Sequence, residues 1–164
     1  MVTNRKIVLV RSPAELINTN LAGYGWGQAN FSDFDSINAI FDYLTSTGID
    51  VGRHRKQMKR FYELKKGDIV VIPVYRAIVV GKIEGTKSYG QGIQHGENRI
   101  RVDYFKDEQG TAVKIPRSKL SQGLESRLKI RMSIASLNDF RDEITEYVNQ
   151  LETDNKVCFD RNIV

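Results

Sequence analysis

The sequence predicts an α+β domain around a small, strongly bent mixed sheet with flanking helices, the sheet being either open or closed into a barrel. Two apolar runs, IVLV near the N-terminus and IVVIP near the middle, are typical of largely buried strands. Two stretches with apolar residues three and four apart lie between these runs, and a third lies near the C-terminus. Because strands and helices do not alternate regularly, a doubly wound parallel sheet is disfavoured.

The composition indicates one soluble globular domain. The chain of 164 residues is long enough for a core of its own, and 40% hydrophobic with 27% charged residues are ordinary globular values. No run approaches the roughly 20 apolar residues that cross a bilayer, and nothing near Met1 resembles a signal peptide. The single cysteine, Cys158, excludes an internal disulfide and favours a reducing compartment. We therefore expect a cytoplasmic protein with no membrane partner.

The first third of the chain predicts a strand, a glycine-rich aromatic stretch and a helix. Residues 6–10 form the strand, and GYGWGQANF follows at residues 23–31, with three glycines and three aromatics. Ser32 or Asp33 is predicted to cap the helix, which ends at Gly48. Its apolar face is expected to hold Phe34, Ile37, Phe41 and Leu44.

A second helix is predicted over residues 53–64, with one apolar and one basic face. Met58, Phe61, Tyr62 and Leu64 supply the inner side. The outer side carries five cations: Arg53, Arg55, Lys56, Lys59 and Arg60. Cations clustered along one helix are typical of surfaces that hold phosphates.

The middle of the chain predicts a buried β-hairpin. The turn KGD leads into a strand at residues 69–73, and a partner strand returns over residues 77–83. Gly81 is expected to be a close-packing or bulge position in that second strand. Tyr75 and Arg76 lie at the corner between the strands, where Gly, Asn or Asp is usual. An exposed Tyr-Arg pair at this corner is suggestive of binding, although exposed hairpins tolerate it.

The remaining elements are a loop, two strands and a helix. Residues 84–98 are rich in glycine and serine and are predicted to form a long hairpin loop. Residues 99–105 alternate apolar and polar side chains, as a half-exposed strand does. A last short strand is expected within residues 132–137. The final helix spans residues 139–152, and its apolar stripe holds Phe140, Ile144, Tyr147, Val148 and Leu151.

The charge divides the chain unevenly. We expect a folded body at residues 1–138, the final helix packed on it at 139–152, and a linker or tail at 153–164. The formal net charge is +5, but residues 139–164 carry −4, so the body carries +9. A basic body indicates a polyanionic partner, and solvated surface lysines explain the charge about equally well.

Catalytic machinery is not visible. The two histidines, His54 and His95, are isolated in the sequence, so neither a nucleophile–base pair nor a zinc site is predicted. Asp50, Glu63 and Lys65 imitate the Asp…Glu-x-Lys pattern of metal-dependent nucleases. That site needs its carboxylates on adjacent strands, whereas Glu63 falls at a helix end. We predict no enzyme activity, no metal and no cofactor, and keep a small nuclease as an alternative.

Several short sequence motifs occur along the chain in an order that resembles a known family. They are GWGQ at 25–28, KGDIVVIP at 66–73, IVVGKIEG at 78–85, VDY at 102–104, IPRS at 115–118 and MSI at 132–134. This series resembles the N-terminal domain of Mrr-type restriction proteins, which belongs to the PUA-like group with EVE and YTH domains. The similarity covers about residues 7–137.

The resemblance implies a compact PUA-like barrel that recognises nucleic acid in a modification-dependent restriction or antiphage system. In such systems a nuclease or AAA+ motor lies in a separate domain or subunit. Related domains hold a modified base, flipped from its strand, between aromatic walls. The chain differs from the full restriction protein by having no catalytic domain after residue 153, and by the insertion-like loop at 84–98.

These considerations assign candidate residues to a DNA interface. The base pocket is predicted to contain Trp26, Tyr24, Tyr75 and Phe31. The phosphate backbone is predicted to contact Arg53, Arg55, Lys56, Lys59, Arg60, Arg76, Arg117 and Lys119. An aromatic platform returns part of the cost of extruding a base, and cations gain affinity by counterion release. A partly buried core tryptophan is the alternative for Trp26, RNA is the alternative ligand, and a protein-interaction module docked by the final helix is a further alternative.

Overall fold

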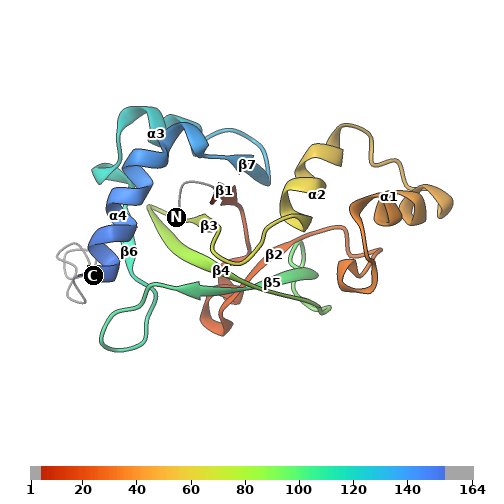
Figure 1. Ribbon diagram of the computed structural model, residues 1–164, viewed down its shortest axis with the longest axis horizontal. Coiled ribbons are helices and arrows are strands. Elements are labelled where there is room, and N and C mark those ends of the chain that lie inside the picture. Colours follow the sequence, from red (N-terminus) through yellow and green to blue (C-terminus); the bar gives the residue numbers. More distant parts are fainter. Residues whose placement is uncertain (1–4, 154–164) are drawn as a thin grey trace.

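The computed structural model describes residues 5–153 and has a seven-stranded mixed sheet with helices on both faces (Figure 1). The strands are β1 (Ile7–Val10), β2 (Leu21–Tyr24), β3 (Ile69–Val74), β4 (Ala77–Tyr89), β5 (Asn98–Tyr104), β6 (Lys114–Pro116) and β7 (Ile134–Ser136). Their order is β2-β5-β4-β3-β1-β7, with β6 paired to β4. The β1–β3 pair is parallel and the other strand pairs are antiparallel.

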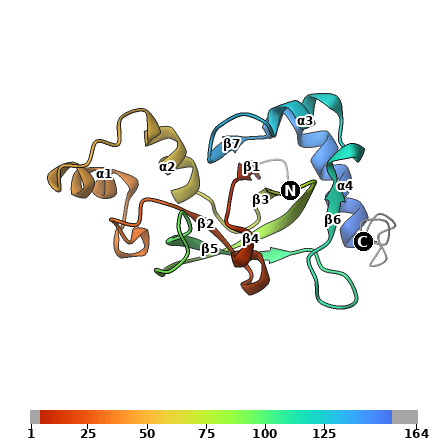
Figure 2. The ribbon, with the colours of Figure 1, turned by 180° about the vertical axis from the view of Figure 1, so that it is seen from behind.

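The helices lie in two groups, one toward each face of the sheet. They are α1 (Ile37–Ser46), α2 (Arg55–Tyr62), α3 (Gln122–Arg127) and α4 (Arg141–Thr153). Five 3₁₀ turns accompany them: η1 (Ala14–Thr19), η2 (Phe31–Asp33), η3 (Gly52–His54), η4 (Arg117–Lys119) and η5 (Asn138–Phe140). Figures 1 and 2 show α1 and α2 on one side of the molecule and α3 and α4 on the other. The predicted α+β class is therefore confirmed.

The continuous apolar runs are explained by a core on each face of the sheet. In β1, Val8 and Val10 join the core under α1 and α2, whereas Ile7 and Leu9 join the core under α3 and α4. The same alternation divides β3, whose residues 69–72 are all buried. A strand covered on both faces needs apolar side chains at every position, which is why these segments show no period of two.

β4 is longer than the sequence predicts. Residues 84–98 do not form one long loop, because β4 continues to Tyr89 and pairs again with the start of β5. The register between β4 and β5 shifts between Ile83 and Lys87, and Gly85 has a φ of +118°. A bulge of this kind bends a strand, and its glycine and serine imitate a loop signal in the sequence. Only residues 90–97 connect the two strands.

The beginning of α1 is also displaced from its predicted position. Ser32 and Asp33 belong to η2, which Asn30 caps, and the cap of α1 is Ser36, whose Oγ accepts a hydrogen bond from Ala39 N at 3.1 Å. The wrong cap was predicted because Ser32, Asp33 and Ser36 are all favourable cap residues. A further strand, β2, was not predicted.

Several structural predictions are confirmed. A Cβ atom at Gly81 would lie 2.5 Å from Val102 Cγ1, so this strand position is a close-packing one. Ile144, Val148 and Leu151 of α4 are buried in the core that α4 shares with the sheet. The predicted tail after α4, including Cys158, lies outside the described residues. None of the described helices is long and apolar enough to cross a membrane.

Candidate nucleic-acid interface

The glycine-rich aromatic stretch forms a loop whose backbone is held by one buried side chain. Asn98, the first residue of β5, is fully buried, and its Oδ1 accepts a hydrogen bond from Phe31 N at 2.8 Å. Its Nδ2 donates to the carbonyl oxygens of Gly25, Trp26 and Ala29 at 2.9, 3.1 and 3.0 Å. With the amide flipped, Nδ2 would face the Phe31 N–H and Oδ1 would face the three carbonyl oxygens, so the hydrogen-bond network selects the orientation described. Asn98 therefore positions the whole loop.

Trp26 is held in an unusual backbone conformation. Its φ is +60°, in the left-handed region, which costs an L-residue with a bulky side chain about 1–2 kcal/mol. The indole Nε1 donates to Tyr24 Oη at 3.1 Å, and the ring of His54 meets the indole edge-on, with centroids 5.6 Å apart. The ring is half-buried and its direction is set by these two neighbours.

Trp26 lines a cleft of about 550 Å³, which we name the tryptophan cleft. Five parts of the chain meet there: the residue after β1, the end of β2 with its following loop, the start of α2, the turn between β4 and β5, and the segment before β7. The lining comprises Arg11, Tyr24, Gly25, Trp26, Gly27, Gln28, His54, Gln57, Gln94, His95, Glu97, Arg131 and Ser133. The volume is in the range of about 300–1,000 Å³ that is common for small-molecule sites.

The lining of the tryptophan cleft is polar apart from its two aromatic rings. Amide side chains contribute donors and acceptors, and His54, His95 and Glu97 add titratable ones. Gln57 also ties the cleft together, because its Oε1 accepts hydrogen bonds from the backbone N–H groups of Ser133 and Ile134 at 3.0 and 3.1 Å. The cleft is therefore suited to a flat ligand with polar edges.

Two contacts of Gly27 close one side of the cleft. A Cβ atom at Gly27 would lie 2.9 Å from Glu97 Cγ, so the glycine lets this loop approach the β4–β5 turn. The Tyr89 hydroxyl donates to the Gly27 carbonyl oxygen across the same gap. His95, in the turn itself, is after Trp26 the second non-glycine lining residue of this cleft with positive φ, +64°.

Two of the predicted pocket aromatics belong to the core. Phe31 is 2% exposed and its ring packs at 6.4 Å from that of Phe61, so it does not form a wall of the cleft. Tyr24 is 5% exposed, and its ring lies 5.2 Å from Phe61. It contributes to the cleft lining, its hydroxyl accepts the hydrogen bond from Trp26, and burial raises the pKa of that hydroxyl. A stacking wall needs a free face, which neither ring has.

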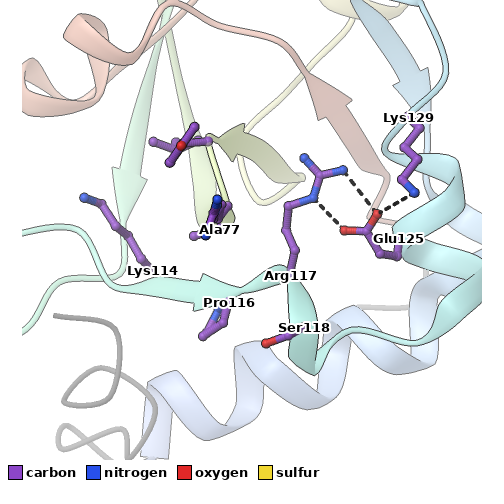
Figure 3. A pocket seen from close by; sticks show the side chains of 10 residues that line it. Ala77, Lys114, Pro116, Arg117, Ser118, Glu125 and Lys129 are labelled. Atoms are coloured by element: carbon purple, nitrogen blue, oxygen red, sulfur yellow. Dashed lines mark hydrogen bonds and ion pairs between the residues drawn. The ribbon is translucent and has the colours of Figure 1, made fainter.

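Tyr75 does not share a pocket with Trp26. It lies at the β3–β4 turn, at one end of β4, whereas the tryptophan cleft lies beside the other end. Tyr75 and Arg76 line a different cleft of about 820 Å³, the tyrosine cleft, between this turn, β6 and α3 (Figure 3). The length of β4, which continues to Tyr89 instead of ending at the predicted residue 83, separates the two clefts.

The predicted phosphate contacts are distributed over the molecule. Lys56, Lys59 and Arg60 line a third cleft of about 300 Å³ together with Lys6, and Arg55 turns toward α1, with its guanidinium 4.9 Å from the Phe41 ring centroid.

The remaining predicted cations lie elsewhere. Arg76 and Arg117 line the tyrosine cleft, while Arg53 and Lys119 line none of these three clefts. The basic helix is therefore not one continuous phosphate surface, because a helix turns successive residues about its axis.

The structure also bears on the nuclease alternative and on the protein-interaction alternative. Asp50 and Glu63 are both exposed, and within residues 5–153 no group of three or more His, Cys, Asp or Glu side chains could hold a metal ion. Glu63 is the one carboxylate in the lining of the third cleft, whose other charged lining residues are cations. The apolar stripe of α4 that would dock a partner is covered by the sheet of the chain itself.

Sequence reasoning missed Asn98, Arg11, Arg131 and the glutamines of the tryptophan cleft. For Asn98 a signal was present, because it has the same strand parity as Ile100, Val102 and Tyr104, all of which are buried. A polar residue at an inward position must find hydrogen-bond partners, which marks it as a structural anchor. The other residues carry no local signal, since the cleft joins segments far apart in the chain.

Comparison of the chain with protein-family models, with curated proteins and with solved structures gives no match. The site is therefore interpreted from its own geometry and chemistry.

Proposed function

We propose that the chain is a non-catalytic DNA-recognition module that holds an extruded base, modified or not, in the tryptophan cleft. The observation that carries this proposal is the fixed indole of Trp26 beside a polar lining. A base needs a flat surface for its ring and hydrogen-bonding groups for its edge. Both are available in the tryptophan cleft, and the buried Asn98 network holds them in place.

The lining supports a nucleobase over an apolar ligand. Gln28 and Gln94 carry amides, which pair with base edges through both a donor and an acceptor, whereas Gln57, whose Oε1 accepts from two backbone N–H groups, offers its donor. Stacking on an aromatic side chain contributes about 1–3 kcal/mol per base, comparable with the few kcal/mol needed to extrude one from a duplex. Holding an extruded base therefore requires both stacking on an aromatic ring and hydrogen bonds to the edge of the base.

Cations near the tryptophan cleft are available for phosphates. Arg131 lines it directly, and α2 extends from it to the third cleft, which Lys56, Lys59 and Arg60 line. Each phosphate that is neutralised releases counterions, so binding through these cations weakens as salt rises. The resemblance to restriction proteins supports a partner nuclease or motor domain, which would supply the chemistry.

The test is a binding comparison at two salt concentrations by fluorescence anisotropy. Plain, methylated and hydroxymethylated duplexes and matching RNA serve as ligands, with wild type and Trp26→Ala. We expect a preference for one DNA form, and a loss of about 5- to 150-fold in affinity for that form on Trp26→Ala, equal to the stacking of one base. Salt-sensitive background binding should persist in the variant.

The matched control is Tyr43→Ala, which removes an aromatic ring that is 42% exposed on α1 and lines none of the three clefts. It should bind like wild type. A wild-type protein without affinity for any nucleic acid at low salt would show that the proposal is wrong. Preference for the RNA would replace DNA by RNA as the ligand.

A further inference from the structure

The tyrosine cleft combines an exposed aromatic ring with an excess of positive charge. Tyr75 is 85% exposed, has a φ of +55°, and its ring lies 5.4 Å from the guanidinium carbon of Arg76. The positive φ is what the two-residue turn between Val74 and Ala77 requires. The ring belongs to neither core and is therefore available for binding.

The charges of the tyrosine cleft are only partly compensated within the protein. Its one acidic side chain, Glu125, is engaged by Arg117 Nε at 2.7 Å and by Lys129 Nζ at 3.6 Å (Figure 3). Among the described residues, Arg76 and Lys114 form no ion pair. These two cations are therefore free to bind an anion beside the ring of Tyr75.

One segment of the chain contributes residues to both the tyrosine cleft and the tryptophan cleft. Lys129 lines the first and Arg131 the second, two residues apart on the segment between α3 and β7. Arg11 fixes this segment, because its guanidinium donates to the carbonyl oxygens of residues 128, 130 and 132. Burial and, to a smaller extent, the charge of Arg117 lower the pKa of Arg11; Arg117 lines the tyrosine cleft and Arg11 the tryptophan cleft.

We infer that the tyrosine cleft is a second subsite for the same DNA strand. It holds a further unpaired nucleotide of the strand whose extruded base occupies the tryptophan cleft; the base of this further nucleotide stacks on Tyr75 and its phosphate contacts Arg76 and Lys114. The strand passes over the segment that Arg11 fixes, which contributes residues to both clefts. This inference rests on the proposed function and narrows its ligand to DNA with a short unpaired stretch, rather than a duplex opened at a single base.

The free face of Tyr75 suits this role. The guanidinium of Arg76 lies over the Tyr75 ring and is attracted to it by a cation–π interaction. Tyr75 is still 85% exposed, so the ring can also stack with a base. A base stacked there is read without sequence preference, since every base has an aromatic face. The tryptophan cleft would then select the base, and the tyrosine cleft would select an unpaired strand.

The inference is tested with single-stranded DNA of about 4 and about 16 nucleotides, the range of site sizes of single-strand-binding domains. Wild type, Trp26→Ala, Tyr75→Ala and Lys114→Ala are compared, with Lys106→Ala, an exposed cation outside the three clefts, as the charge control. Tyr75 and Lys114 are exposed, so their replacement leaves the core intact.

We expect wild type to prefer the longer strand. Tyr75→Ala should weaken binding of the longer strand about 5- to 150-fold and leave the shorter one unchanged, whereas Trp26→Ala should weaken both. Lys114→Ala should reduce the slope of log affinity against log salt by about 0.7 for the longer strand, and Lys106→Ala should not change it.

The failures are distinguishable. If Trp26→Ala weakens binding but Tyr75→Ala and Lys114→Ala match wild type on both lengths, the second subsite is wrong and the proposed function stands. If wild type binds neither length nor any duplex at low salt, both are wrong. If only Tyr75→Ala weakens binding, the tryptophan cleft is not the base site and the inference, which needs both clefts, is overturned.

Discussion

The tryptophan cleft and the tyrosine cleft both present an aromatic residue with a left-handed backbone, but they are supported differently. Trp26 is half-buried, and the Asn98 side chain and the Tyr24 hydroxyl hold its backbone and ring. Tyr75 lies on a hairpin turn and is 85% exposed. The first residue is part of the hydrogen-bonded interior, whereas the second depends on local turn geometry alone.

The difference shows how a fold can build two kinds of recognition surface. A buried polar network gives one fixed geometry and is costly to disturb, because every group in it depends on the others. An exposed side chain on a turn is tolerant of change and leaves the rest of the fold unaffected. We therefore expect substitutions in the tryptophan cleft to alter stability and binding together, and substitutions in the tyrosine cleft to separate them.

The largest effect is expected for Asn98→Ala. It would leave the Phe31 N–H and three loop carbonyl groups without their partner, and each unsatisfied buried group costs about 1–3 kcal/mol. We expect a loss of about 3 kcal/mol or more in the free energy of unfolding, measured by urea denaturation.

Two further variants sharpen this prediction. Asn98→Asp keeps the shape but sets carboxylate oxygens against carbonyl oxygens, so it should be as damaging as alanine. Asn38→Ala, at an exposed position of α1, should change stability little. Near-wild-type stability of Asn98→Ala would show that the loop does not depend on this network.

Glycine at the two left-handed aromatics should change stability in opposite directions. Tyr75→Gly removes backbone strain and loses almost no packing, so it should stabilise the protein by about 0.5–1 kcal/mol after the greater freedom of glycine in the unfolded chain is included. Trp26→Gly removes similar strain but loses packing and the hydrogen bond to Tyr24, and should destabilise by about 2 kcal/mol.

Thermal and urea unfolding of the two glycine variants measure this contrast, with Tyr43→Gly as the control for an exposed aromatic in a helix. Effects of the same sign at Trp26 and Tyr75 would contradict the distinction between a supported and an unsupported aromatic.

The smallest effect is a pH dependence above neutrality. Burial raises the pKa of both Tyr24 and Tyr104 above the ordinary value of 10.0. A raised folded-state pKa means that the stabilisation is fully present below about pH 10 and is lost as the pH rises, because the unfolded chain releases these protons first. Stability should therefore fall above pH 10.

Two phenylalanine variants show which tyrosine causes the fall of stability with pH. Tyr104→Phe should flatten it more than Tyr24→Phe, whose shift is opposed by the hydrogen bond from Trp26. Tyr75→Phe, at the exposed ring, serves as the control. Equal slopes for wild type and both core variants would show that neither buried tyrosine contributes to the pH dependence.

Much of the fold was predictable because local patterns have local causes. The apolar runs at β1 and β3, the alternation of β5 and the stripe of α4 each reflect burial that repeats along one element. The β3–β4 turn was also placed correctly. The end of β4 was missed because its bulge replaces the strand pattern with glycine and serine.

The candidate site was less predictable. The sequence singled out Trp26 and Tyr75 as unusual aromatics, yet placed them in one pocket, and it assigned Phe31 to a wall when it belongs to the core. Aromatic residues near glycines occur in pockets and in cores alike, so composition does not decide between the two.

The sequence by itself determined the α+β class, the two-sided burial of the sheet, the basic body and the aromatic residues available for binding. Only the tertiary structure decided which of them meet, because the clefts join segments more than a hundred residues apart, such as Trp26 with Arg131. Local propensity sets the shape of an element, whereas the pairing order β2-β5-β4-β3-β1-β7 brings distant loops together. A long, bent β4 then places the tryptophan and tyrosine clefts beside opposite ends of one strand, with the Arg11-fixed segment between them.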